Sequence, residues 1–250
     1  MIVLRSNKQF QFEYYSDDQD NFIGNQIANN GYEPFESQLF LENLRENSIL
    51  LDIGANIGYY TILGSKIIKS GQIFSFEPFE PNFHLLEMNI LKNRISNAVA
   101  LQLAASSDRG RTKLFIAPDN HGDHQLYQNS DRLSIDVNMV SIDQFISEQH
   151  VFPDVIKIDT QGYDFRVLQK MSNLISNSNN LVVFIEFWNL GNRNAGIDPI
   201  KYFDFLETSF KSIEFIDEMN HVTFPTDYSY VEIECSKYGG INHANLICKK

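Results

Sequence analysis

The stretch Ser48-Ile-Leu-Leu-Asp-Ile-Gly-Ala-Asn-Ile-Gly58 decides the fold that we expect for this chain. Its first part is a short apolar run, typical of a buried strand, and Gly54 follows that run. Apolar residues then recur with helical spacing from Tyr59 to Ile68, and Ser70-Gly71 is typical of the end of a helix. The stretch therefore predicts a strand, a glycine-rich turn and a helix.

The same alternation of strand and helix patterns continues along the chain. Further strand-like runs cover Ile73–Phe76, Ala98–Leu103, Lys113–Ile116, Val155–Ile158 and Leu181–Ile185, with closing strands at Phe215 and Leu246–Cys248. Helical patterns cover Pro81–Asn93, Ile142–Gln149 after Ser141, Phe165–Ile175, and a last helix from Asp198-Pro199 through Leu206. This order predicts an α/β fold with a mostly parallel sheet in residues 48–250. Residues 1–47 are expected to form an additional N-terminal β/α extension packed on that sheet.

Composition excludes several classes of protein. Of the 250 residues 43% are hydrophobic and 21% charged, which is enough for a large core and excludes wholesale disorder. The net charge of −12 repels phosphate backbones and argues against nucleic acid as a partner. Two cysteines are too few for a disulfide framework. The N-terminus has no signal-like segment, and the longest apolar run, Leu181–Trp188, is interrupted by Glu186, so we expect a soluble, cytoplasmic protein without a membrane partner.

The ends of the predicted strands are where a ligand is expected, because a doubly wound sheet binds ligands beyond the carboxyl ends of its strands. The first strand ends in the turn from Asp52 to Gly58, and the following helix directs free N–H groups toward a ligand. The second strand ends at Glu77, 19 residues after Gly58. An acid at about this distance accepts both hydroxyls of a ribose, so the pair predicts a cofactor that contains a nucleoside.

The residues of the turn distinguish between two such cofactors. A dinucleotide site has glycine at the third and sixth positions of its G-x-G-x-x-G motif, where this chain has Asn56 and Tyr59. Asp52 also repels a pyrophosphate but suits a positively charged amino-acid end. S-adenosyl-L-methionine has such an end, carries a sulfonium and lacks phosphate. The turn therefore favours S-adenosyl-L-methionine over NAD.

A set of motifs in fixed order resembles the FkbM-type S-adenosylmethionine-dependent methyltransferases over residues 30–250. The motifs are Tyr32-Glu33-Pro34, Asp52–Gly58, Phe76-Glu77-Pro78 with Asn82, Val140–Asp143, Ile156–Gly162 with Asp164 and Val167-Leu168, Glu186-Phe-Trp188 and Asn245-Leu-Ile. The resemblance implies a Rossmann-like class I methyltransferase fold with a seven-stranded sheet, helices on both faces and a reversed last strand. It also implies O-methylation of a hydroxyl on a sugar, glycan or natural product.

The resemblance carries roles over to individual residues of the cofactor site. It implies that Asp52, Gly54, Asn56 and Gly58 hold the methionine end and that Glu77 accepts the ribose hydroxyls, with Pro78 shaping that turn. The backbone near Ala104 and Ala105 is expected to face the adenine. Glu33, in the segment before the first strand, is expected either to meet the methionine ammonium or to be an exposed acid.

Three residues are candidates for the chemistry of transfer. Asp159 ends the strand predicted over Val155–Ile158 and is expected to act as a base or to orient the cofactor. His124 in the polar loop 117–130 has the pKa range of a base. Glu186 is expected to bind the acceptor. His121-Gly-Asp123-His124, or Asp159 with Glu186, offers possible metal ligands, but we expect no metal.

Gln161 is a departure, since most members of the resembled family have glutamate there, and an amide cannot act as a base. Gln161 keeps open the alternative of an inactive module that binds the nucleoside cofactor. A second alternative is an NAD-linked oxidoreductase, against which Asn56 and Tyr59 count. The sequence indicates neither the acceptor nor the oligomeric state.

Overall fold

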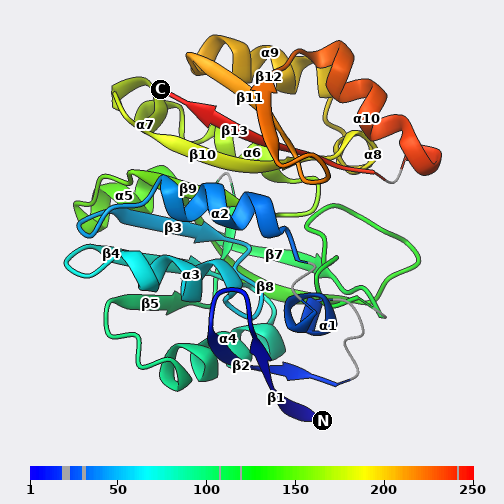
Figure 1. The fold of residues 1–250 in the computed structure, drawn as a ribbon. Coiled ribbons are helices and arrows are strands. Elements are labelled where there is room, and N and C mark those ends of the chain that lie inside the picture. Colours follow the sequence, from blue (N-terminus) through cyan, green and yellow to red (C-terminus); the bar gives the residue numbers. More distant parts are fainter. Residues whose placement is uncertain (19–22, 30–31, 107, 119, 241) are drawn as a thin grey trace.

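Strand β3 (Ile49–Ile53) lies inside an eight-stranded sheet with the order β12-β11-β13-β10-β9-β3-β4-β5 (Figure 1). The structure is a computed structural model and describes residues 1–18, 23–29, 32–106, 108–118, 120–240 and 242–250. The other strands of this sheet are β4 (Gln72–Phe76), β5 (Ala98–Leu101), β9 (Val155–Ile158), β10 (Val182–Phe187), β11 (Ser212–Asp217), β12 (Val222–Pro225) and β13 (Ala244–Lys249).

The topology confirms the predicted class I arrangement. Strands β5, β4, β3, β9 and β10 are parallel, and β13 runs antiparallel to both β10 and β11. The expected reversed strand is therefore present as β13, but the sheet has eight strands where seven were expected. The additional strand β12 forms a hairpin with β11, in which Asp217 Oδ1 accepts the backbone N–H groups of Met219 and Asn220, each at 3.0 Å.

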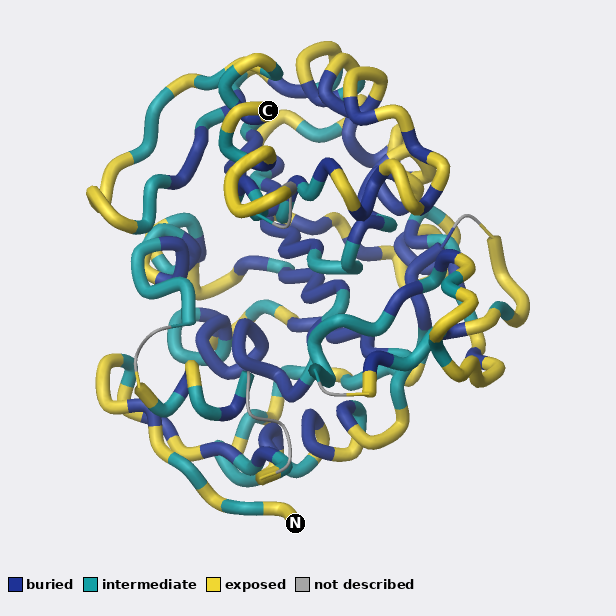
Figure 2. Tube along the Cα trace, turned by 90° about the vertical axis from the view of Figure 1, so that its right-hand side faces the viewer, coloured by how far each residue is buried: buried dark blue, intermediate teal, exposed yellow. Residues whose placement is uncertain are grey.

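Both faces of the sheet are buried, as the continuous apolar runs predict. On one face Leu50 and Ile73 pack against α2 (Pro34–Glu42), α3 (Tyr59–Ile67) and α4 (Glu80–Lys92). On the other face Leu51 and Phe74 pack against a second group of helices, and Figure 2 shows the buried centre that results. That group is α5 (Ile142–Gln149), α6 (Asp164–Gln169), α7 (Ser172–Asn177), α9 (Pro199–Ser209) and α10 (Tyr228–Gly240), while α8 (Asn189–Asn194) follows β10.

Several predicted elements differ from those in the structure. The strand expected over residues 98–103 ends at Leu101, where a tight turn begins with the Leu103 N–H donating to the Leu101 carbonyl at 2.8 Å. Residues after this turn join a separate sheet of β6 (Ala104–Ser106), β8 (Ser134–Ser141) and β7 (Gly110–Phe115), in that order.

Two further differences concern helices. The helix expected over residues 165–175 is two helices, because the chain bends at Lys170 and Met171 through i→i+3 hydrogen bonds. Helix α9 is not the last, since α10 follows it. Only a short apolar stripe on α10, with Val231 and Cys235 buried, marks it in the sequence.

The N-terminal residues add a β-hairpin and two helices beside the sheet: β1 (Ile2–Asn7), β2 (Phe12–Asp17), α1 (Ile23–Ala28) and α2. Residues 19–22 and 30–31 of the expected extension lie outside the described residues. The hairpin lies beside α4, where Asn89 Oδ1 accepts the Tyr15 N–H at 2.5 Å and its Nδ2 donates to the Tyr15 carbonyl at 3.0 Å (Figure 1). The boundary that we propose between extension and main domain falls between α2 and β3.

An ion pair and two hydrogen bonds to a carboxylate hold helix α2 on the sheet. Lys157, in the middle of β9, donates from Nζ to Glu36 Oε1 at 2.7 Å, and both side chains are buried. Glu218, after β11, accepts the N–H groups of Phe35 and Glu36 at 3.0 and 2.7 Å, which satisfies the start of the helix. Of the helices in the described part of the chain, none has the length and apolar character needed to cross a membrane.

Replacing Lys157 by methionine should destabilise the protein by about 3–5 kcal/mol, because Glu36 would stay buried without its partner. The double variant Lys157→Met with Glu36→Leu should lose less stability, since it removes both buried charges. Urea unfolding of the wild type and of both variants measures these differences. A single variant as stable as the wild type would contradict this view of the pair.

Candidate active site

A cavity of about 420 Å³ opens at the carboxyl ends of β3, β4, β9 and β10. Such a volume suits a ligand of cofactor size. The cavity brings together nearly all of the residues that the sequence singled out: Glu33, Asp52, Gly54, Asn56, Glu77, Pro78, Ala104, Ala105, His124, Asp159 and Glu186. Gly58 lies outside this lining, at the N-cap of α3.

The glycine-rich turn after β3 is shaped by close packing inside the protein. A Cβ on Gly54 would lie 1.9 Å from the carbonyl oxygen of Asp159, and the backbone of Gly54 has a φ of +83°. Gly58 also has a positive φ, +91°, which disfavours any residue with a side chain at this position. Glycine at position 54 thus lets the ends of β3 and β9 meet, which brings the turn and Asp159 to the same cavity.

Glu77 is fixed at the end of β4 by two backbone donors. Its Oε2 accepts the Asn56 N–H at 2.9 Å and its Oε1 accepts the Phe79 N–H at 2.8 Å. Burial raises the pKa of Glu77 to about 7, even though both hydrogen bonds favour the ionised form. Each carboxylate oxygen keeps a lone pair that is free for a ligand hydroxyl.

Asp52 lies on the floor of the cavity and is held by α3. The Thr61 hydroxyl donates to Asp52 Oδ2 at 2.6 Å and also contacts Ser75 Oγ at 2.7 Å. Burial raises the pKa of Asp52 to about 6. The carboxyl group is therefore costly to ionise in the free protein and would gain from a cation placed in the cavity.

An apolar wall lies beyond Glu77. It is formed by Pro78, Leu103, the buried pair Ala104 and Ala105 at the start of β6, and Leu126. A wall of small and aliphatic side chains suits the face of a flat aromatic ring.

His124 lies near this wall, with its ring centroid 4.2 Å from that of Phe79. Its Nδ1 accepts the Ala117 N–H at 3.1 Å, so the neutral ring carries its proton on Nε2. Burial lowers the pKa of His124 to about 4. This geometry makes Nε2 a hydrogen-bond donor toward the cavity.

In the same loop the Asp123 carboxylate forms an ion pair with Arg132.

Four polar side chains meet at the other end of the cavity, where β9, β10 and β13 lie side by side. Gln161 Nε2 donates to Asp159 Oδ1 at 2.7 Å and to Glu186 Oε2 at 3.1 Å. His243 Nδ1 lies 3.2 Å from Glu186 Oε1. Burial and the nearby Glu186 raise the pKa of Asp159 well above its usual range, whereas His243 and Lys157 hold that of Glu186 below its usual value against the effect of burial.

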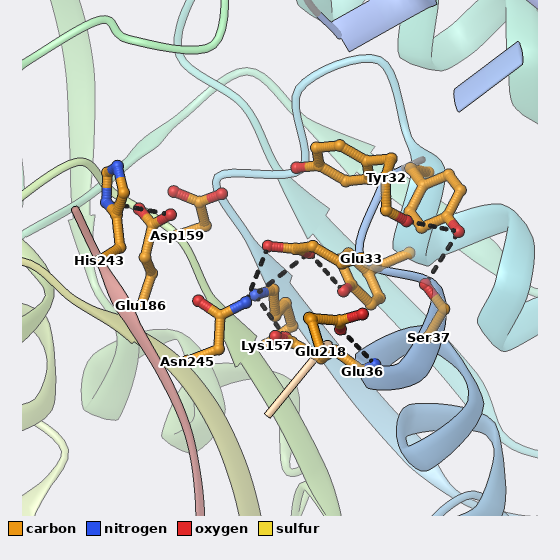
Figure 3. A network of polar contacts seen from close by, with 12 residues as sticks. Tyr32, Glu33, Glu36, Ser37, Lys157, Asp159, Glu186, Glu218, His243 and Asn245 are labelled. Atoms are coloured by element: carbon orange, nitrogen blue, oxygen red, sulfur yellow. Dashed lines mark hydrogen bonds and ion pairs between the residues drawn. The ribbon is translucent and has the colours of Figure 1, made fainter. Parts of the chain in front are cut away.

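Glu33 joins this end of the cavity to the N-terminal segment (Figure 3). Its Oε2 accepts the Tyr60 hydroxyl at 2.6 Å and lies 3.9 Å from Lys157 Nζ, and its Oε1 accepts from Asn245 Nδ2 at 3.2 Å. Glu33 is therefore held in the cavity wall as part of a network and is not an exposed acid beside Pro34.

The balance of charge fits a ligand with positive charge. Five carboxyl groups line the cavity, those of Glu33, Asp52, Glu77, Asp159 and Glu186. Positive charge among the described lining residues comes from Lys157 and from the imidazole of His243. Several buried side-chain atoms in the described cavity lining lack hydrogen-bond partners: Asn56 Oδ1, Asn82 Oδ1, His124 Nε2, Thr160 Oγ1 and His243 Nδ1. The last of these lies at ion-pair distance from Glu186 Oε1, without hydrogen-bond geometry. The residues thus suit a polar, cationic group such as S-adenosyl-L-methionine and would oppose a pyrophosphate.

Two residues of the site were missed by the sequence analysis. Lys157 had a readable signal, because a charge within the apolar run Val155–Ile158 needs a buried partner. His243 had none, since a single histidine before a closing strand gives no indication of the strand that will lie beside it.

Comparison with known proteins agrees with this geometry. The model of the methyltransferase FkbM domain matches residues 52–219. Hexuronic acid methyltransferase AglP of Haloferax volcanii is 28% identical over 65% of this chain and 62% of its own length. Methyltransferase sdnD of Sordaria araneosa is 24% identical over 52% of this chain and 62% of its own length. The chain thus spans 62% of each of these two relatives.

Solved structures share the fold at low sequence identity. A protein from Streptococcus mutans, solved in complex with SAH, is 11% identical, with 87% of this chain and 97% of that chain aligned at a TM-score of 0.51. The tRNA m1G37 methyltransferase of M. jannaschii is 10% identical, with 99% and 56% aligned at a TM-score of 0.50. Because the family model covers well over half of the residues, the chain belongs to the FkbM methyltransferase family, and S-adenosyl-L-methionine is its cofactor.

Proposed function

We propose that this protein is an O-methyltransferase that methylates a hydroxyl of a sugar, glycan or natural product. The observation that carries the proposal is the division of one cavity into a cofactor half around Glu77 and a polar half around Asp159, Gln161 and Glu186. The naming of one relative as a hexuronic acid methyltransferase supports an acceptor of the sugar class. The cytoplasmic location expected from the sequence stays a prediction.

The cofactor half is assigned as follows in this proposal. Asp52, Asn56, Glu33 and the turn of Gly54 and Gly58 hold the methionine end, where carboxylates face an ammonium. Glu77 accepts the ribose hydroxyls, and Pro78, Ala104 and Ala105 enclose the adenine. The bound cofactor supplies an activated methyl group on its sulfonium.

The polar half orients the acceptor and receives its proton. Asp159, Glu186 and Gln161 offer hydrogen-bond partners for hydroxyl groups beside the cofactor half. His124 lies on the apolar wall near Phe79, so we assign its Nε2–H a hydrogen bond to the cofactor and not the removal of a proton.

Ligand-induced stabilisation should separate the candidate cofactors. S-adenosyl-L-methionine and S-adenosylhomocysteine should each raise the melting temperature, because a ligand at 100 times its Kd stabilises the folded state by about 2.7 kcal/mol. NAD at the same concentration should cause no shift, since its pyrophosphate would meet the carboxylates. Differential scanning fluorimetry measures all three. Stabilisation by NAD alone would support the oxidoreductase alternative instead.

Glu77→Ala should weaken S-adenosylhomocysteine binding by on the order of 1–3 kcal/mol, because the ribose hydroxyls lose their acceptor. Glu87→Ala, at an exposed acid on α4, is the matched control and should bind normally. A pKa of about 7 means that Glu77 is protonated below that pH, so wild-type affinity should fall by about tenfold from pH 8 to pH 6. Titration calorimetry at both pH values tests this assignment, which unchanged affinity in Glu77→Ala would refute.

Transfer of label from methyl-tritiated S-adenosyl-L-methionine should identify the acceptor group. We expect p-nitrophenyl β-D-glucuronide or p-nitrophenyl β-D-glucoside to acquire a methyl ether, which survives mild alkali. Label released by alkali as volatile methanol would show a methyl ester and contradict transfer to a hydroxyl. Stabilisation by S-adenosylhomocysteine without transfer to any hydroxyl compound would support the inactive binding module.

A further inference from the structure

His243 is placed to take part in the reaction, although no sequence motif pointed to it. It directly precedes β13 and lines the same cavity as Asp159. Its Nδ1 lies 3.2 Å from Glu186 Oε1, and about a third of the side chain is exposed. Figure 3 shows the imidazole ring beside the carboxyl groups of Glu186 and Asp159.

Glu186 is itself held in one orientation. Its Oε2 accepts from Gln161 Nε2 at 3.1 Å, which leaves Oε1 to face His243. The imidazole ring also lies near Trp188, with ring centroids 5.3 Å apart. Its neighbours thus include a fixed carboxylate and an aromatic side chain.

A carboxylate beside Nδ1 selects the form of neutral histidine that carries its proton on Nδ1. The lone pair on Nε2 is then free to accept a proton, as in other histidine–carboxylate pairs that act as bases. We propose that His243 is the general base for the methyl transfer and that Glu186 is the residue that positions it. This inference rests on the proposed O-methyltransferase function.

The methyl transfer needs only the acceptor hydroxyl, the cofactor and His243. The acceptor oxygen forms a bond to the methyl carbon, the carbon–sulfur bond breaks, and its electron pair stays on sulfur. The hydroxyl proton moves to Nε2 of His243, which becomes an imidazolium next to the Glu186 carboxylate. The proton then leaves to solvent through the exposed part of the ring.

Two other candidate bases fit the geometry less well. The Nδ1 lone pair of His124 is occupied by the Ala117 N–H, so its Nε2 carries a proton and cannot accept another. Asp159 accepts from Gln161, and nearby carboxyl groups with burial favour its protonated form.

The groups that face His243 also determine its pH dependence. They are Glu186 on β10, Asp159 after β9 and Glu33 before α2, and Lys157 lies behind them. Burial alone would lower the pKa of His243, but these carboxyl groups raise it to about 9. His243 is therefore protonated in the free protein at neutral pH. The sulfonium charge of the bound cofactor opposes this and should lower the pKa of the ring.

The decisive experiment reads the imidazole directly and needs no acceptor. Long-range ¹H–¹⁵N spectra of the histidine rings are recorded against pH for the protein bound to S-adenosylhomocysteine and to S-adenosyl-L-methionine. His243→Asn assigns the signal. His84→Gln is the matched control, because His84 on α4 is an exposed histidine 3.9 Å from Glu87.

We expect the neutral His243 ring to carry its proton on Nδ1, with a lower pKa in the sulfonium complex than in the thioether complex. Glu186→Gln should lower the pKa further and abolish the preference for the Nδ1–H form. A neutral His243 with its proton on Nε2 in the wild-type complex would overturn the inference. So would equal pKa values in the two complexes.

Kinetics with p-nitrophenyl β-D-glucuronide and p-nitrophenyl β-D-glucoside provide the second readout. His243→Asn and Glu186→Gln should each lower kcat by on the order of 10²–10⁴-fold while Kd for S-adenosylhomocysteine changes less than about threefold. In the wild type kcat/KM should rise with pH until about pH 9. His84→Gln should leave the rates unchanged.

The two proposals fail separately. If neither compound is methylated, the proposed function fails for these acceptors, whereas the ring spectra still decide the state of His243. If transfer occurs and His243→Asn retains a near-normal kcat, the proposed function stands and the inference about His243 is wrong.

Discussion

The arrangement of the site depends on the ion pairs that the buried ammonium group of Lys157 forms with two glutamates. Lys157 lies in the central strand β9, donates to Glu36 at 2.7 Å and lies 3.9 Å from Glu33. A lysine in such a position is stable only if carboxylates surround it, and these carboxylates come from the N-terminal segment. The pairing therefore draws residues 33–36 onto the sheet, completes the cavity wall and brings Glu33 to the end of the cavity near Asp159.

The same end of the sheet holds more negative charge than Lys157 can balance. Burial raises the pKa of Asp52 to about 6 and of Glu77 to about 7. Because these folded-state values exceed the ordinary values, the folded state binds protons more tightly than the unfolded state. The stability that these groups contribute is present at low pH and is lost as the pH rises through about 6 to 7. At neutral pH the free protein thus holds ionised carboxyl groups in a buried site at a cost in solvation, which a cationic cofactor relieves.

The sequence allowed prediction of what local patterns determine. The buried run Ile49–Ile53, the turn of Gly54 and Gly58 and the acid Glu77 each carry their signal within a few residues. The mostly parallel sheet follows from the alternation of strands and helices. Contacts between distant segments could not be predicted in this way. The role of Gly54 depends on the backbone of Asp159, and the separate sheet of β6, β7 and β8 depends on a turn at Leu103 that no glycine or proline marks.

The functional interpretation of Gln161 changes once its neighbours in the structure are known. In the sequence it is an amide where an acid is usual in the resembled family, and this keeps open the possibility of an inactive protein. In the structure its Nε2 donates to Asp159 and to Glu186, two carboxyl groups on adjacent strands that would otherwise repel each other. An acid at this position would add a third carboxyl group to the pair and release Glu186 from its orientation. An amide here is therefore consistent with an active site whose base lies elsewhere, on the side of Glu186 that faces His243.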